Sequence, residues 1–155
     1  MEERNVLLDK VTLGAEQVSQ MYYRLLVVVS NDAATIARNI IENLGLHRIN
    51  VGEELGEELL EVPAERRPLE VARLLEELLG AIGGDGVLLD HIEILFDESL
   101  KVEPLALLRG VSRRHLVVVM WSGEIEAGNL LYGFPGHPEY RSYPAQEVAL
   151  VQFPE

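Results

Sequence analysis

The chain has 155 residues, of which 48% are hydrophobic and 25% are charged. This balance is typical of a folded globular protein and excludes intrinsic disorder as the main state. Its 13 basic residues against 26 acidic ones give a net charge of -13. A negative field of this size repels nucleic acid phosphates and anionic lipids, so direct binding to either is not expected.

The length and the segment pattern predict one domain over residues 1–155. No apolar run reaches the roughly 18 residues of a membrane-spanning helix. The first residues lack the basic and then apolar pattern of a signal peptide, and the chain contains no cysteine for disulfides or thiolate chemistry. We therefore expect a cytoplasmic protein that does not contact a membrane.

The first third of the chain alternates between helical and strand patterns. Residues 1–23 predict an irregular lead and a short helix, and the continuous apolar run at 25–29 predicts a strand covered on both faces. Apolar residues then recur at helical spacing from Ala33 to Leu44. Asp32 is predicted to be the N-cap of this helix, and Gly45 is predicted to close it.

The alternation continues to the end of the chain. Residues 47–51 predict a second strand, and two helices follow, one ended by Pro63 and one begun by Pro68 and ended by the glycines after residue 82. Strands are predicted at 87–89, 116–121 and 148–153, a helix at 104–114, a hairpin at 124–132 and turns at 134–138. The pattern predicts a three-layer α/β fold with a mainly parallel sheet.

Polar residues follow three of the predicted strands. Because the ligands of parallel sheets bind at the carboxyl ends of strands, we expect these residues to converge on one edge of the sheet. They are Ser30, Asn31, Asp32 and Thr35 after the first strand, Asp90 and Glu93 after the third, and Ser122 after the fourth.

The order of these segments is that of a P-loop NTPase. The strand ending at Asp90 is typical of a Walker B segment, in which an Asp holds Mg²⁺ and a nearby acid positions water. The phosphate loop itself does not match: the octet 30–37 lacks both glycines of G-x-x-x-x-G-K-[ST] and has Ile36 at the lysine position. The sequence therefore predicts a P-loop NTPase-like fold with a degenerate phosphate loop and without tight nucleotide binding.

The rest of the chain shows no other pattern that is typical of catalysis. No Ser lies in a G-x-S-x-G elbow, and the four His lie on separate elements without ligand spacing. Asp90 can also be interpreted as a cap of the helix that follows it. We therefore expect no catalytic residue, no metal site and no cofactor, with ATP and Mg²⁺ as the alternative.

Three segments of the chain carry a resemblance to a known family. They read VLLDHIEILF at 87–96, PLALLRGVSR at 104–113 and PGHPEYRSY at 135–143, the last being the most specific. The chain resembles BrxF over residues 20–150; BrxF proteins are the small P-loop-containing proteins of type 3 BREX bacteriophage-exclusion systems. The resemblance implies that the polar residues after the three strands bind nucleotide. It also implies a role in phage defence beside the larger BREX proteins, which include a large ATPase and a DNA methyltransferase.

Two segments are candidate surfaces for partner proteins. Residues 53–77 carry nine acids against three arginines, which is either a solvated helix face or a docking surface for a basic partner. The segment 135–143 is either a rigid turn or an exposed recognition loop. The candidate partner-binding residues are Glu53, Glu54, Glu57 and Glu58 in the first segment and His137, Tyr140, Arg141 and Tyr143 in the second.

Taken together with the degenerate phosphate loop, the resemblance implies an accessory subunit of a prokaryotic BREX-type phage-defence complex. The subunit is expected to act through other BREX proteins, above all the large ATPase, with weak nucleotide binding or none. Two alternatives stay open: a Mg²⁺-dependent ATPase with an unorthodox phosphate loop, and a regulator that acts on DNA through a partner.

Overall fold

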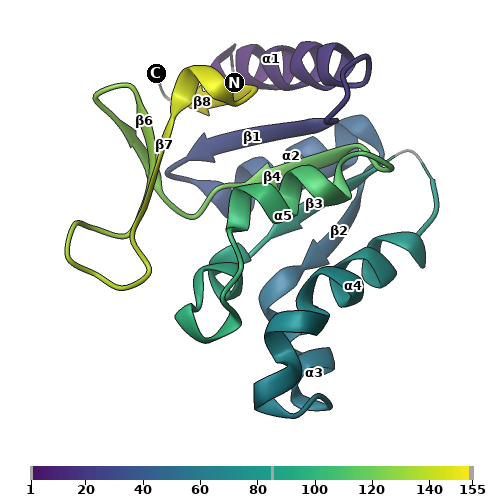
Figure 1. Ribbon diagram of the computed structural model, residues 1–155. Helices are drawn as coiled ribbons and strands as arrows, with labels where there is room; N and C mark the ends of the chain where they lie inside the picture. The colour runs from purple at the N-terminus through teal and green to yellow at the C-terminus, as the bar shows by residue number, and fades with distance from the viewer. Residues whose placement is uncertain (1, 85, 154–155) are drawn as a thin grey trace.

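The computed structural model describes residues 2–84 and 86–153, which form an α/β fold around a central parallel sheet (Figure 1). The sheet has five strands in the order β2–β3–β4–β1–β8, and every neighbouring pair is parallel. The strands are β1 (Leu25–Ser30), β2 (His47–Asn50), β3 (Val87–Asp90), β4 (Val117–Met120) and β8 (Leu150–Phe153). The mainly parallel α/β sheet predicted from the sequence is confirmed.

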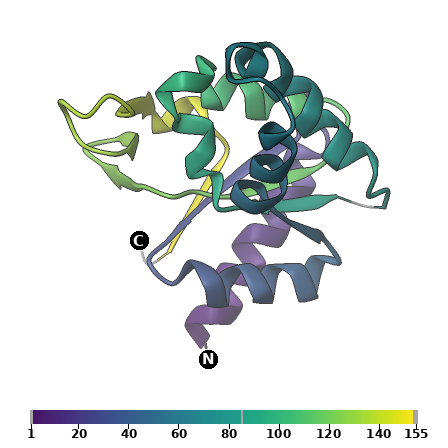
Figure 2. The same cartoon turned by 90° about the horizontal axis from the view of Figure 1, so that it is seen from below.

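Helices cover both faces of this sheet (Figure 2). Helices α1 (Glu2–Val18) and α2 (Ala33–Leu44) lie on one face, and α3 (Val51–Leu60), α4 (Arg67–Gly80) and α5 (Pro104–Val111) lie on the other. Successive residues of β1 point to opposite faces: Leu26 packs on the α1–α2 side, whereas Leu25 and Val27 pack on the α3–α5 side. Burial on both faces explains why the strands are continuous apolar runs.

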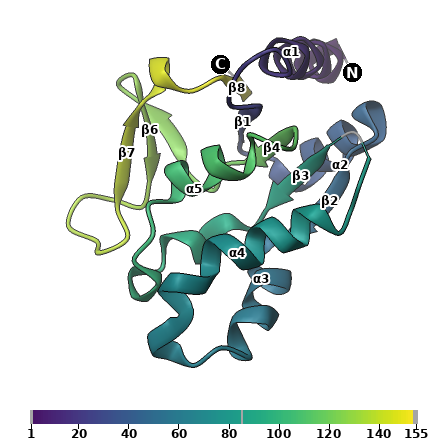
Figure 3. The ribbon, with the colours of Figure 1, turned by 45° about the vertical axis from the view of Figure 1, so that its right-hand side comes forward.

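A second, smaller sheet lies beside the carboxyl edge of the central sheet (Figure 3). It is antiparallel and consists of β5 (Glu124–Glu126), β6 (Asn129–Tyr132) and β7 (Arg141–Pro144). The turn between β5 and β6 has positive φ at Ala127 (53°) and Gly128 (79°), as a tight hairpin requires. The ring of Tyr132 stacks on that of Phe96 at 3.7 Å between centroids, which joins the small sheet to the core.

Boundaries that depend on local chemistry are confirmed. Helix α2 spans Ala33–Leu44, and Gly45 ends it in the left-handed conformation with φ 67°. Asp32 does occupy the N-cap position, but its side chain makes no capping hydrogen bond. Within the described part of the chain, none of the helices combines the length and the apolarity that crossing a bilayer requires.

Other predicted boundaries were wrong. The irregular lead is helical from Glu2, and Val51 begins α3 instead of ending β2, because the Asn50 side chain accepts the Glu53 backbone N–H and caps the helix. Helix α5 ends at Val111, and the last strand begins at Leu150. The sequence did not predict β7 or the short 3₁₀ helices at 64–66, 92–96, 98–100 and 145–147.

Candidate functional site

A cleft of about 680 Å³ opens at the carboxyl edge of the central sheet. Its walls come from the ends of β1, β3 and β4 and the segments that follow them, from one side of α2 between Ala33 and Glu42, and from Arg48 of β2. Ser30, Asp90, Glu93 and Ser122 all line it, so the predicted convergence of the three strand ends is confirmed for these residues. Parallel strands deliver the residues that follow them to one edge, which is why segments distant in the sequence meet here.

The connection between β1 and α2 is too short to form a phosphate loop. β1 ends at Ser30 and α2 begins at Ala33, so that only Asn31 and Asp32 lie between them. The Asp32 backbone N–H donates to Ser30 Oγ at 3.1 Å and closes the turn. Phosphate loops need a wider run of backbone N–H groups around the phosphates. Asn31, Asp32 and Thr35 are not part of the cleft wall.

Asp90 is paired with an arginine of the neighbouring strand. Arg48 Nε on β2 donates to Asp90 Oδ2 at 2.7 Å, and the Asp90 side chain is 14% exposed. Asp90 Oδ1 is buried and has no hydrogen-bond partner in the structure. The interpretation of Asp90 as a helix cap is wrong, because His91 occupies the N-cap position of the next 3₁₀ helix, with φ 51°. Asp90 Oδ1 thus keeps acceptor capacity that none of the described groups uses.

The other two predicted residues of the cleft contact each other. Ser122 Oγ donates to Glu93 Oε1 at 3.0 Å, which joins the segments after β4 and β3. Arg38 and Glu42 of α2 also line the cleft, so two arginines face three carboxylates there. Such a balance gives no excess of positive charge for a triphosphate.

Sequence reasoning missed Arg48 as part of this site, whereas the place of Arg38 on the helix after the first strand already indicates that it can reach back toward the strand ends. Arg38 lies one turn into α2, and Arg48 lies on the edge strand β2, whose neighbour is β3. The parallel register pairs Asn50 with Asp90, and the Arg48 side chain reaches the carboxylate from two residues earlier on β2, a contact for which the sequence carries no local signal. Among the described residues, no group of three His, Cys, Asp or Glu is arranged to hold a metal ion.

The acidic residues predicted to bind partners divide into two kinds. Glu53, Glu57 and Glu58 are exposed on α3. Glu54 is half-buried, and its Oε2 accepts the Asn50 backbone N–H at 3.0 Å. Glu54 therefore stabilises the start of α3, whereas the other three have carboxylates free to face solvent or a partner.

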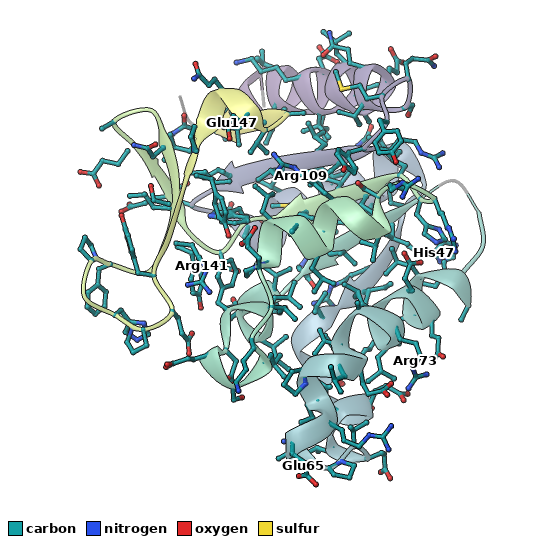
Figure 4. The ribbon with its side chains drawn as sticks, viewed as in Figure 1. His47, Glu65, Arg73, Arg109, Arg141 and Glu147 are labelled. Carbon is teal, nitrogen blue, oxygen red and sulfur yellow. The ribbon has the colours of Figure 1, made fainter. Side chains whose placement is uncertain are left out.

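The candidate recognition segment is exposed only in its first part. His137 is exposed, and its Nδ1 accepts the Glu139 backbone N–H at 3.1 Å. Tyr140 and Arg141 are half-buried, with Arg141 at the start of β7 (Figure 4). The exposed loop before β7 is thus the part of this segment that is accessible to a partner.

Tyr143 is half-buried and is held in place by a contact that the sequence did not predict. Its hydroxyl donates to Glu103 Oε2 at 2.5 Å, and its ring meets that of Trp121 edge to face at 6.0 Å. Burial, followed by the hydrogen bond to Glu103, raises the pKa of the Tyr143 phenol well above its usual value. Glu103 also caps α5 by accepting the Leu105 and Ala106 backbone N–H groups. Tyr143 thereby ties β7 to the start of α5.

Comparison of the chain with models of protein families, with curated proteins and with solved structures found no match. Its function has to be inferred from the geometry of the cleft, from the two candidate surfaces and from the resemblance of the three segments.

Proposed function

We propose that the chain is an accessory subunit of a BREX-type bacteriophage-defence complex and serves it by contacts with partner proteins. The resemblance of residues 20–150 to BrxF supports this role, and a parallel five-stranded α/β sheet is compatible with the P-loop-like fold that the resemblance implies. The exposed acidic side of α3 supports binding of a basic partner, of which the large BREX ATPase is the leading candidate.

The observation that carries a non-catalytic role is the two-residue connection from β1 to α2. Without a loop of backbone N–H groups and without a lysine, nothing at this position surrounds the β- and γ-phosphates. The Arg48 guanidinium also holds the carboxylate that would otherwise bind Mg²⁺. Both features weaken contacts with the phosphates of a nucleotide. Hydrolysis depends on the same contacts, because they stabilise the transferring phosphoryl group.

A working Mg²⁺-dependent ATPase is the second candidate, and the cleft itself favours it. Asp90 Oδ1 has no hydrogen-bond partner among the described residues, and the Ser122–Glu93 hydrogen bond lies in the same cleft, after the carboxyl ends of β4 and β3. A nucleotide held there with its Mg²⁺ on Asp90 would use all three residues. This candidate and the first differ in whether nucleotide stabilises the fold.

Thermal denaturation with ATP and Mg²⁺ separates the two candidates. Ligand at a hundred times its Kd adds about 2.7 kcal/mol to the free energy of unfolding, which raises the Tm of a chain of this size by about 5–11 °C. We expect no such rise with millimolar ATP and Mg²⁺. A rise that is lost in Asp90→Asn would instead establish nucleotide binding and favour the ATPase.

Partner binding is tested with a large ATPase of a BREX system. Reversal of the exposed acids by Glu53→Lys, Glu57→Lys and Glu58→Lys should slow association and flatten its salt dependence, because charges at the rim of an interface act on the encounter rate. Glu54 is left unchanged because it supports the α3 cap. The matched control is Glu16→Lys, Glu124→Lys and Glu126→Lys, which alters net charge equally at exposed positions elsewhere. Equal effects of both variants would contradict the docking role of α3.

A further inference from the structure

An exposed aromatic and cationic surface lies at the edge where β1 and β4 begin, away from the cleft. Tyr22 is 64% exposed and Met21 is 55% exposed. The Arg113 guanidinium lies 4.7 Å from the centroid of the Tyr22 ring, and the Tyr23 ring meets that ring edge to face at 4.9 Å. We call this surface, which also includes the exposed Arg114, the tyrosine–arginine patch.

Hydrogen bonds fix the patch before any partner binds. Arg24 Nη2 donates to the Arg113 backbone carbonyl at 2.7 Å, and the Arg24 backbone N–H donates to that of Ser112 at 3.0 Å. Tyr, Arg and Met are enriched at the cores of protein interfaces, and rigid side chains lose little entropy on binding. Neither Arg113 nor Arg114 forms an ion pair within the described residues. The patch therefore suits an acidic partner surface.

The chain itself carries an acidic surface with an apolar centre. A groove of about 480 Å³ runs between α3 and the 3₁₀ helix Glu98–Leu100. Glu53, Glu57 and Asp97 line it together with Leu60, which is 75% exposed. Arg67 also lines the groove, but its Nε donates to the Leu59 and Val62 backbone carbonyls, and the three carboxylates leave an excess of negative charge. The Ser99 hydroxyl and backbone N–H donate to Asp97 and lower the pKa of its carboxyl, which keeps it ionised. We call this surface the acidic groove.

The two surfaces lie on different sides of the molecule, so they cannot meet within one copy. Figure 4 shows His47, at the start of β2, on the edge where the strands begin, and Glu65 at the tip beyond the end of α3. The groove lies along α3, and the patch lies where β1 and β4 begin. A contact between them must therefore join two copies of the chain.

We propose that the tyrosine–arginine patch of one copy docks into the acidic groove of a second copy. Charge complementarity supports this occupant: two arginines beside exposed rings meet a groove lined by three carboxylates, one arginine and an exposed leucine. The contact is heterologous, so assembly proceeds head to tail. One acidic groove stays open at the end of each assembly, where a partner protein can still bind.

Analytical ultracentrifugation of the purified chain tests the proposal. The average mass should rise with protein concentration at about 0.1 M salt and return to that of the monomer near 1 M, because the Debye length falls from about 10 to about 3 Å. A patch variant, Tyr22→Ala with Arg113→Ala and Arg114→Ala, should stay monomeric. A groove variant, Glu53→Gln with Glu57→Gln and Leu60→Ser, should also stay monomeric.

The decisive measurement mixes the two variants. Each retains the surface that the other lacks, so an equimolar mixture should form a 1:1 dimer that does not grow further. Melting curves verify that both variants are folded, and Arg114→Glu alone serves as a second patch variant if the triple substitution unfolds. The control Glu124→Gln with Glu126→Gln should assemble like the wild type, since these acids lie on β5.

Three results would overturn the proposal. One is a wild-type chain that stays monomeric at every concentration, and another is assembly that neither variant weakens. The third is a chain that stays monomeric and binds fluorescent single-stranded DNA, with this binding absent in the patch variant. That result would identify the patch as a stacking platform for nucleic acid. None of these results depends on binding to the large ATPase, so self-assembly and the proposed function are tested separately.

Discussion

Replacing Tyr143 by Phe removes one hydroxyl and tests whether this residue stabilises the fold or binds a partner protein. The hydroxyl donates to Glu103 at 2.5 Å, while two backbone N–H groups of α5 donate to the same carboxylate. The Phe variant therefore loses one charge-assisted hydrogen bond but leaves no buried carboxylate without donors. A hydrogen bond to a charged group contributes about 1.5–3 kcal/mol, and the half-exposed setting reduces this contribution.

We expect Tyr143→Phe to lower the free energy of unfolding by about 1–2 kcal/mol, with a fall in Tm of about 2–8 °C. Urea denaturation measures the change. Tyr140→Phe is the matched control on the same segment, because its hydroxyl makes no hydrogen bond within the described residues, and it should cost less than about 0.5 kcal/mol. In the background of Glu103→Ala, the cost of Tyr143→Phe should vanish.

Equal costs for Tyr143→Phe and Tyr140→Phe would refute the reasoning, as would an unchanged cost in the Glu103→Ala background. Partner binding supplies the functional comparison. A Tyr143→Phe chain that is less stable but binds the large ATPase normally would show that this tyrosine positions β7, and attention would pass to the exposed loop at 134–138.

Three further predictions concern pH, the small sheet and the cleft. Burial raises the folded-state pKa of Tyr143 above its unfolded value of about 10. The contribution of Tyr143 to the free energy of unfolding is therefore fully present below that pH and is lost as the pH rises through the raised pKa. Urea denaturation from about pH 9 to about pH 11 should show that stability falls less steeply with pH in Tyr143→Phe than in the wild type. A Cβ at Gly123 would lie 1.8 Å from a carbonyl oxygen of β6, whereas one at Gly110 would meet nothing within 4 Å. Gly123→Ala should therefore lower the free energy of unfolding by more than about 2 kcal/mol, and Gly110→Ala should leave it unchanged or raise it by up to about 1 kcal/mol. Arg48→Met should cost about 1–3 kcal/mol by leaving the Asp90 carboxylate unpaired, and Asp90→Asn in the same chain should restore most of that loss in thermal denaturation.

The candidate cleft was predictable in outline because it follows from strand order. Once β1, β3 and β4 are recognised as parallel strands, Ser30, Asp90 and Ser122 must lie at one edge of the sheet. The Arg48–Asp90 ion pair was not predictable in the same way. It depends on which strand lies next to β3, and an edge strand of four residues gives little information about its neighbour.

Some properties of the acidic helix α3 were predictable from the sequence, and others depend on the tertiary structure. Its density of glutamates is visible in the sequence, and Asn50 followed by Glu53 and Glu54 is a recognisable capping pattern. The sequence does not show that Glu53 is exposed whereas Glu54 is half-buried and accepts the Asn50 backbone N–H, because this difference depends on the turn by which the chain leaves β2.

By itself, the sequence determined the features that depend on neighbours along the chain. Helix α2 and its closing Gly45 follow from residue periodicity and from a left-handed conformation that glycine tolerates. Only the tertiary structure decided that Tyr143 bonds to Glu103, 40 residues away. It also decided that Asp90 faces Arg48 and that Tyr22 and Arg113 form one surface. Such contacts arise when the packing of the whole core fixes the positions of distant backbone segments, and no local preference of the chain encodes them.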